Sequence, residues 1–168
     1  MASRVAVTIL GVILLAGCTR TTLKSTVVGE HPGRDETTEL DFWDGLAESR
    51  LVSNSDALHA LFLSFTQDDP ETYDARLELA RKRGWFDSER AIPERESAEI
   101  GWIARAIYIE SGLEGGVTIR LVGVRERYAV KELNHRDWLP EMSKNQAVSG
   151  LQLISVLSSA EDHLAGES

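Results

Sequence analysis

Apolar residues recur at a helical spacing along most of the chain from Phe42 onward, with short polar stretches between them. Residues three and four apart share one face of a helix, so this spacing indicates amphipathic or buried helices. It predicts five helices, over about residues 57–65, 70–83, 96–110, 126–135 and 149–163. The expected fold class is therefore mainly α, a small helical bundle.

Residues that begin or end helices stand where this pattern needs them. Ser53 or Ser55 can accept a hydrogen bond from the first turn of the helix that follows. Asp69 is expected to cap the next helix, with Pro70 at its first position. Gly84 suits the left-handed position that closes a helix.

The glycine-rich stretch GLEGGVTIRLVG, residues 112–123, interrupts the helical spacing. Val117, Ile119 and Leu121 alternate there with polar residues, which is the two-residue period of a half-buried strand. We therefore expect one short β element between glycine turns, with its partner elsewhere in the chain or across a dimer.

The chain begins with Arg4 and an uncharged, mostly apolar run from Val5 to Leu15. A positive residue, a short apolar run and then small residues are typical of a secretory signal peptide. The run is too short to span a bilayer, which takes about 20 residues. Residues 1–17 are therefore predicted to be a signal peptide that is removed.

Leu15-Ala16-Gly17-Cys18 resembles the lipobox of bacterial lipoproteins, in which a leucine and two small residues precede a cysteine. The resemblance implies that Cys18 becomes the acylated first residue of the mature protein, anchored in a membrane by its lipid. It also implies a place in the cell envelope, with Thr19 favouring the periplasmic face of the outer membrane. An ordinary signal peptide with a chance cysteine is the alternative. Cys18 is the only cysteine, so an intramolecular disulfide is excluded.

Residues 18–40 are polar and lack a helical period, so we expect a flexible tether ahead of a domain spanning residues 41–164. The full chain carries a formal net charge of −9. So acidic a protein is a poor general binder of anionic lipid, and no nucleic-acid partner is expected. Residues 76–136 nevertheless contain more basic than acidic residues, so a local basic face can form there.

The chain resembles itself at a shift of 53 residues. The matched pairs are Trp85-Phe86 with Trp138-Leu139, Glu99-Ile100 with Gln152-Leu153 and, for an earlier partial copy, Val52-Ser53 with Val148-Ser149. Each unit is a helix, a turn that closes with Trp and an apolar residue, a loop, and a second helix. Units that cannot bury their own apolar faces are expected to pack on each other.

These units, of which LARKRGWFDSERAIPERESAEIGWIARAI is the fullest copy, resemble the S-layer homology domain over about residues 46–160. The resemblance implies two to three helix-loop-helix repeats packed as a three-fold bundle. In that family an arginine at the start of the second helix helps bind an anionic cell-wall polysaccharide. Asn54, Ser97 and Gly150 stand at the corresponding positions, so the fold is expected to carry over without that binding site.

The sequence contains no recognisable pattern for catalysis, a cofactor or a metal. The four histidines are dispersed, and none has the spacing of a paired metal ligand. His135-Arg136-Asp137 matches the start of a protein-kinase catalytic loop, but Met142 stands where that loop needs an asparagine. His59 lies within an apolar helix and is expected to be a packed core residue. The chain is therefore predicted not to be an enzyme.

Trp85 and Trp138 occupy equivalent positions just after a helix, and they are the candidate ligand surface because aromatic faces bind sugars and peptides. The alternative is that both pack back on the preceding helix as core residues. The sequence thus predicts a membrane-anchored, non-catalytic module that binds a cell-wall polysaccharide or an envelope protein. An accessory subunit of an envelope protein complex is the alternative function.

Overall fold

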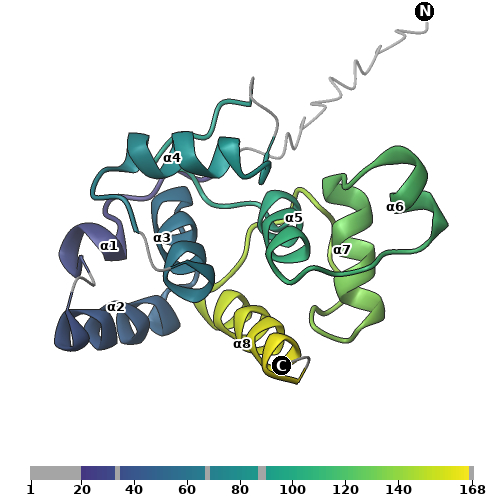
Figure 1. The fold of residues 1–168 in the computed structure, drawn as a ribbon. Helices are drawn as coiled ribbons and strands as arrows, with labels where there is room; N and C mark the ends of the chain where they lie inside the picture. Colours follow the sequence, from purple (N-terminus) through teal and green to yellow (C-terminus); the bar gives the residue numbers. More distant parts are fainter. Residues whose placement is uncertain (1–19, 33–34, 67–68, 87–89, 167–168) are drawn as a thin grey trace, which may run out of the picture.

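The computed structural model describes residues 20–32, 35–66, 69–86 and 90–166. The predicted signal peptide and Cys18 lie outside the described residues. Within them the chain is mainly helical, as predicted (Figure 1). The helices are α1 (Val27–Glu30), α2 (Glu36–Glu48), α3 (Asn54–Phe65), α4 (Tyr73–Lys82), α5 (Ile100–Glu110), α6 (Val117–Val122), α7 (Glu126–His135) and α8 (Gly150–Gly166).

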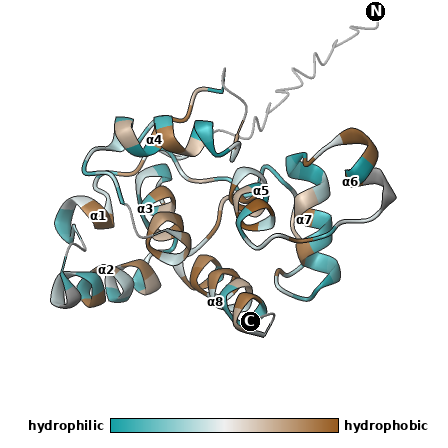
Figure 2. Ribbon diagram, viewed as in Figure 1, coloured by the Kyte–Doolittle hydropathy of each residue, from teal (hydrophilic) through white to brown (hydrophobic). Residues whose placement is uncertain are grey.

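Six of these helices pair into three units, α2–α3, α4–α5 and α7–α8. The second helix of each unit packs on the first helix of the next: α3 on α4, α5 on α7, and α8 on α2. The units therefore close into a ring, with α6 inserted between α5 and α7. Hydrophobic residues concentrate on α3, α5 and α8, whereas α4 and α7 carry more hydrophilic residues (Figure 2).

Three backbone hydrogen bonds join the units. The N–H of Val52 donates to the carbonyl of Val148 (3.0 Å), that of Ala98 to Val52 (2.8 Å), and that of Val148 to Ala98 (3.3 Å). All three residues are fully buried, and buried backbone polar groups need partners. Each residue lies two positions before the second helix of its unit, so this three-bond ring fixes where those helices start.

The first N–H groups of α3, α5 and α8 have no acceptor within their own helix. Loops of neighbouring units supply the acceptors. Asn54 and Ser55 donate to the carbonyls of Glu96 and Glu94, Ile100 and Gly101 to those of Gln146 and Lys144, and Gly150 to that of Ser49. We call α3, α5 and α8, the second helices of the three units, the central helices. The loop that precedes each central helix thus caps the central helix of another unit, which couples all three units.

Two glycines permit this close approach. A Cβ added to Gly101 would lie 2.7 Å from the carbonyl oxygen of Lys144, and one added to Gly150 would lie 1.5 Å from that of Leu46. Neighbouring backbone leaves no room for a side chain at either position, so both helices need glycine in their first turn.

The three-bond ring of Val52, Ala98 and Val148 also corrects the alignment of the repeats. Asn54, Ile100 and Gly150 are equivalent, because each follows its ring residue by two positions. Placing Ser97 in this set is wrong by three residues, because the loop after Trp85 is three residues longer than the one after the second tryptophan. Residues 96–99 make bridges and loop hydrogen bonds, so α5 begins later than predicted.

Helices α4, α5 and α7 all end with a residue of positive φ followed by an apolar residue. Gly84 (φ 78°), Gly112 (φ 60°) and Asp137 (φ 59°) take the left-handed position. The residue that follows donates its N–H to a carbonyl five residues back, as Trp85 does to Ala80 (3.0 Å). This is the Schellman arrangement, and the predicted role of Gly84 is confirmed.

The predicted cap of α3 is correct and that of α4 is wrong. Ser53 accepts a hydrogen bond from the N–H of Asp56 (3.0 Å), and the Asp56 side chain accepts one from Ser53 in return. Helix α4 begins after Thr72, which caps it. Asp69 instead binds two side chains of the interior, so Pro70 lies ahead of the helix.

The strand predicted around residues 117–121 is wrong, because this segment is helix α6. Ile119 is buried at 9% exposure while Leu121 is 80% exposed, so the alternation does not separate core from solvent. A strand also needs a partner. Among the described residues the β pairing consists of isolated bridges, Thr22 with Glu96, Ser53 with Ser97, and Glu99 with Ala147.

The described part of the predicted tether packs on the domain. The N–H of Leu23 donates to the carbonyl of Arg95 (2.8 Å), and the N–H of Val28 donates to the Asp56 carboxylate (2.9 Å). Helix α2 begins within the same predicted tether. The polar side chains of this segment predicted a flexible tether and not a docked one. The contacts are made instead by backbone groups and by two partly buried valines, Val27 and Val28.

Removing this docked segment is expected to destabilise the domain. A chain beginning at Asp35 keeps α2 and its cap but loses the hydrogen bonds of residues 21–28. Each bond contributes about 1 kcal/mol, so its free energy of unfolding in urea should fall by about 3 kcal/mol or more relative to a chain beginning at Arg20. Equal stability of the two chains would contradict the docking.

Candidate functional site: a basic hollow beside helix α6

Trp85 does not face solvent. Its side chain is fully buried, its ring centre lies 4.8 Å from that of Phe62, and its indole N–H donates to Glu110 (2.7 Å). Burial would raise the pKa of Glu110, but hydrogen bonds from Arg83 and Trp85 outweigh that effect and lower the pKa. Trp85 is therefore a core residue, and its prediction as a ligand surface is wrong.

Trp138 occupies the equivalent turn but is only half-buried. Its ring centre lies 5.5 Å from that of His163, and the Arg136 guanidinium lies 5.9 Å from its ring centre. With Ser159 and Asp162 these residues line a shallow hollow of about 530 Å³. The structure thus separates the two tryptophans that the repeat makes equivalent, and only Trp138 has a face that a ligand could reach.

The two tryptophans should therefore differ in their contribution to stability. Trp85→Ala is expected to lower the free energy of unfolding by about 3–5 kcal/mol, as for other buried aromatic residues. Trp138→Ala should cost about half as much, because less apolar surface is lost from its half-buried ring. Urea unfolding of both variants measures this difference, and equal small losses would contradict the burial of Trp85.

His59, Asp69 and Arg76 form a buried cluster where α3 meets the start of α4. The Nδ1 atom of His59 lies 2.9 Å from the Asp69 carboxylate, and Arg76 holds that carboxylate with two N–H groups at 2.6 and 2.5 Å. Burial would raise the pKa of Asp69, but hydrogen bonds from His59 and Arg76 lower it. The prediction that His59 is a packed residue is confirmed, since it is fully buried with Phe42 edge-on at 4.5 Å.

This cluster contains an Asp–His pair, but no described side chain that could act as a nucleophile is hydrogen-bonded to the free nitrogen of the histidine. The Nε2 atom of His59 is buried, and no described residue forms a hydrogen bond with it. No group of three or more His, Cys, Asp or Glu side chains that could hold a metal ion occurs in the described part of the chain. The geometry is that of an internal ion pair that joins α3 to α4.

Asp69→Asn is expected to lower the free energy of unfolding at neutral pH by about 3 kcal/mol, because it leaves the buried Arg76 without its counter-charge. The folded-state pKa of Asp69 lies below its ordinary value of 3.8. The wild-type advantage is therefore complete above that value and is lost as the pH falls through the folded-state pKa.

Urea unfolding from neutral to strongly acidic pH should show wild type and Asp69→Asn converging at the acid end. Asp41→Asn, at an exposed position of α2, is the control and should change stability little at any pH. A difference between wild type and Asp69→Asn that keeps its full size in acid would contradict the role of the carboxylate.

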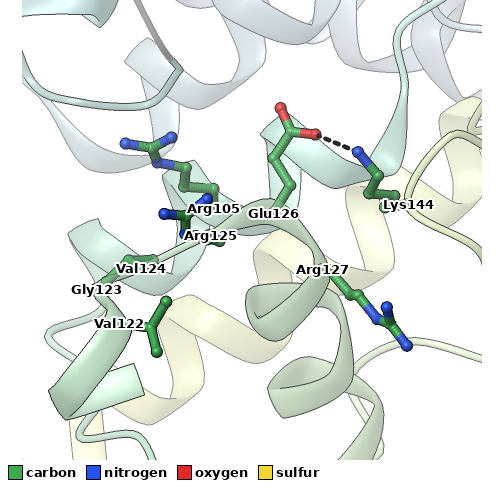
Figure 3. A pocket seen from close by; sticks show the side chains of 8 residues that line it. All are labelled: Arg105, Val122, Gly123, Val124, Arg125, Glu126, Arg127 and Lys144. Carbon is green, nitrogen blue, oxygen red and sulfur yellow. Dashed lines mark ion pairs between the residues drawn. The ribbon is translucent and has the colours of Figure 1, made fainter. Parts of the chain in front are cut away.

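Beside α6 lies a hollow of about 650 Å³ whose charged lining is four basic residues and one acidic residue. Arg105 comes from α5, Arg125, Glu126 and Arg127 come from the start of α7, and Lys144 comes from the loop before α8 (Figure 3). Residues 122–124 complete the wall. We call this site, lined by residues 105, 122–127 and 144, the basic hollow.

The turn at Gly123 forms the hollow locally. Its φ of 82° lies in the left-handed region that favours glycine, and this turn connects α6 to α7. Val124 packs against the core, while Arg125, the residue that precedes α7, is exposed. Figure 3 shows Arg105 and Arg125 on one side of Glu126, with Arg127 directed away from them.

A chain of ion pairs supports one side of the hollow. Glu126 pairs with Arg90 and with Lys144, whose Nζ lies 3.7 Å from the carboxylate (Figure 3). Arg90 also pairs with Glu99, which in turn binds Arg20 at 3.1 Å. The acidic residue of the hollow is thus already neutralised by the fold itself.

Arg125 and Arg127 give the hollow a positive potential. Neither Arg125 nor Arg127 has an ion-pair partner among the described residues, and both are exposed. Charges farther away than about 8–10 Å are largely screened at physiological salt. The acidity of the whole protein therefore does not cancel this site, and the hollow can accept an anionic group.

The sequence indicated this site only in part. An excess of basic residues over 76–136 predicted a local basic face, and that segment supplies three of the four basic side chains of the hollow. Lys144 falls outside it. The packing of α5 on α7 brings Arg105 beside Arg125 across an intervening helix, which no residue spacing reveals.

No family model matches this chain, and no curated protein and no solved structure matches it. Within the described part of the chain, no helix is both long enough and apolar enough to cross a bilayer. The residues and geometry of the basic hollow are therefore the basis for its functional interpretation.

Proposed function

We propose that this chain is a lipid-anchored envelope protein whose helical domain is a non-catalytic module that holds an anionic component of the envelope. The basic hollow is the observation that carries the proposal, because it concentrates positive charge on an otherwise acidic protein. Leu15-Ala16-Gly17-Cys18 supports the anchor, with lipid attached at Cys18 and the domain on the periplasmic face of the outer membrane.

The lining of the hollow suits phosphate or carboxylate groups. A guanidinium presents several N–H donors in one plane and can bind two oxygens of one anion at once. Arg125 and Arg127, which are exposed and have no ion-pair partner among the described residues, therefore present donors that the acidic residue of the hollow, Glu126, does not occupy. Such a site recognises charge and shape and requires no covalent chemistry.

The hollow is distinct from the position at which S-layer homology domains carry their arginine. Here the equivalent residues are Asn54, Ile100 and Gly150, and all three are buried. Asn54 donates its side-chain N–H to the Pro93 carbonyl (2.9 Å), and Gly150 has no room for a side chain. Anion binding is therefore proposed at the basic hollow and not at that position.

The anchor and the hollow can be tested on the full chain produced in a bacterium and solubilised in a non-ionic detergent. The intact mass should show cleavage before Cys18 with attached acyl chains, both absent from Cys18→Ala. The purified lipoprotein should bind phosphocellulose at low salt, because a local basic site binds an anionic matrix despite the net charge.

Charge reversal tests whether the hollow is responsible. Arg125→Glu with Arg127→Glu should lower the salt concentration needed for elution, since two phosphate contacts are lost and repulsion is added. The matched control is Arg50→Glu with Lys82→Glu, two exposed positions elsewhere with the same change in net charge. Equal effects of the two pairs would show that only overall charge matters, and the proposed site would fall.

A further inference from the structure

We propose that the anionic component held by the basic hollow is the headgroup layer of the membrane that carries the lipid anchor. In this arrangement the end of α6 enters the bilayer surface and the arginines around it contact lipid phosphates. The inference rests on the proposed function and identifies its ligand. Three observations, on exposed apolar residues, on the position of the chain's start and on charge, support it.

The first observation is an exposed apolar end of α6. Four large apolar residues remain exposed among those described, and two of them, Leu121 (80%) and Val122 (46%), are consecutive at this end. Figure 2 shows α6 at the periphery, with hydrophobic residues at its outer side. Ile119 is buried and fixes the helix to the core, so the apolar end is held in place.

The second observation is that ion pairs connect the start of the described chain, close in sequence to Cys18, with the basic hollow. One residue, Thr19, separates Cys18 from Arg20 in the sequence, and two steps along a chain span at most about 7 Å. Arg20 is tied to Glu99, Glu99 to Arg90, and Arg90 to Glu126 in the basic hollow. A continuous chain of ion pairs thus connects the point where the described chain begins with the basic hollow.

The third observation is the combination of charge and hydrophobicity. Exposed leucine and valine beside arginines would give little to a hydrated polysaccharide. A bilayer surface offers phosphates at one depth and acyl chains immediately below, and interfacial segments bury their apolar residues about 5–10 Å into that boundary. Val122 itself lines the hollow, so the apolar and basic parts of the surface are contiguous.

The experiment uses the full, lipidated chain reconstituted into vesicles, with Leu121→Cys as the site of a dye sensitive to polarity. Cys18 carries lipid in a thioether, so the dye reacts only with the thiol introduced at position 121. One set of vesicles is phosphatidylcholine, and the other contains phosphatidylglycerol as well. Leu40→Cys is the matched control, since it is also exposed but lies on α2, at the other end of the molecule from α6 (Figure 1).

We expect the dye at position 121 to shift to shorter wavelengths in the vesicles that contain phosphatidylglycerol, and to shift little in phosphatidylcholine alone. High salt should reverse the shift while the protein stays on the vesicles, because screening weakens phosphate contacts and leaves the anchor intact. Arg125→Glu with Arg127→Glu should at least halve the shift, and Arg50→Glu with Lys82→Glu should leave it unchanged. The dye at position 40 should not shift.

The outcomes separate this inference from the proposed function. An acylated protein that floats with both kinds of vesicle, with a dye at position 121 that never shifts, overturns the inference and leaves the anchor standing. The inference would also be overturned if purified cell-wall polymer retained the protein and charge reversal of the basic hollow abolished this retention. The hollow would then bind cell-wall polymer and not lipid. An intact mass without acyl chains, together with a Leu121→Cys, Cys18→Ala protein that floats only with anionic vesicles and shows the shift, would support the docking and overturn the proposed anchor.

Discussion

The fold depends on three buried backbone hydrogen bonds among Val52, Ala98 and Val148. Each bond joins segments that are far apart in the chain, and each leads directly into a central helix. Breaking one would leave a buried donor and acceptor unpaired, which costs more than a hydrogen bond at the surface. Because the neighbouring loops also cap these helices, helix starts, unit contacts and ring closure depend on the same few residues.

The basic hollow arises where this ring is least regular. Among the described residues, no helix lies between the first unit and the second, whereas α6 is inserted between the second unit and the third, after α5 and before α7. The close packing of α5 on α7 holds the inserted segment at the surface and places Arg105 beside the start of α7. The repeat therefore supplies stability, while the departure from it supplies the surface that we propose to be functional.

Sequence reasoning predicted the parts of the structure that depend on local spacing. Apolar periodicity located five helices, and a glycine after a basic turn, Gly84, marked a helix end that the structure confirms. It predicted a strand where the structure has α6. Apolar and polar residues that alternate over a short segment are typical of a strand, and the sequence does not show whether a partner strand is present. It missed the docking of residues 20–31, and it left the core packing of Trp85 as one of two alternatives, since both depend on contacts with residues distant in sequence.

Closure of the ring has a consequence for the order of folding. Val148 lies two positions before α8, so neither of its two ring bonds can form until the chain has been synthesised at least as far as this residue. Contacts of such long sequence separation slow folding, since the loop entropy must be overcome first. The ring therefore closes late in folding, when α8 packs on α2.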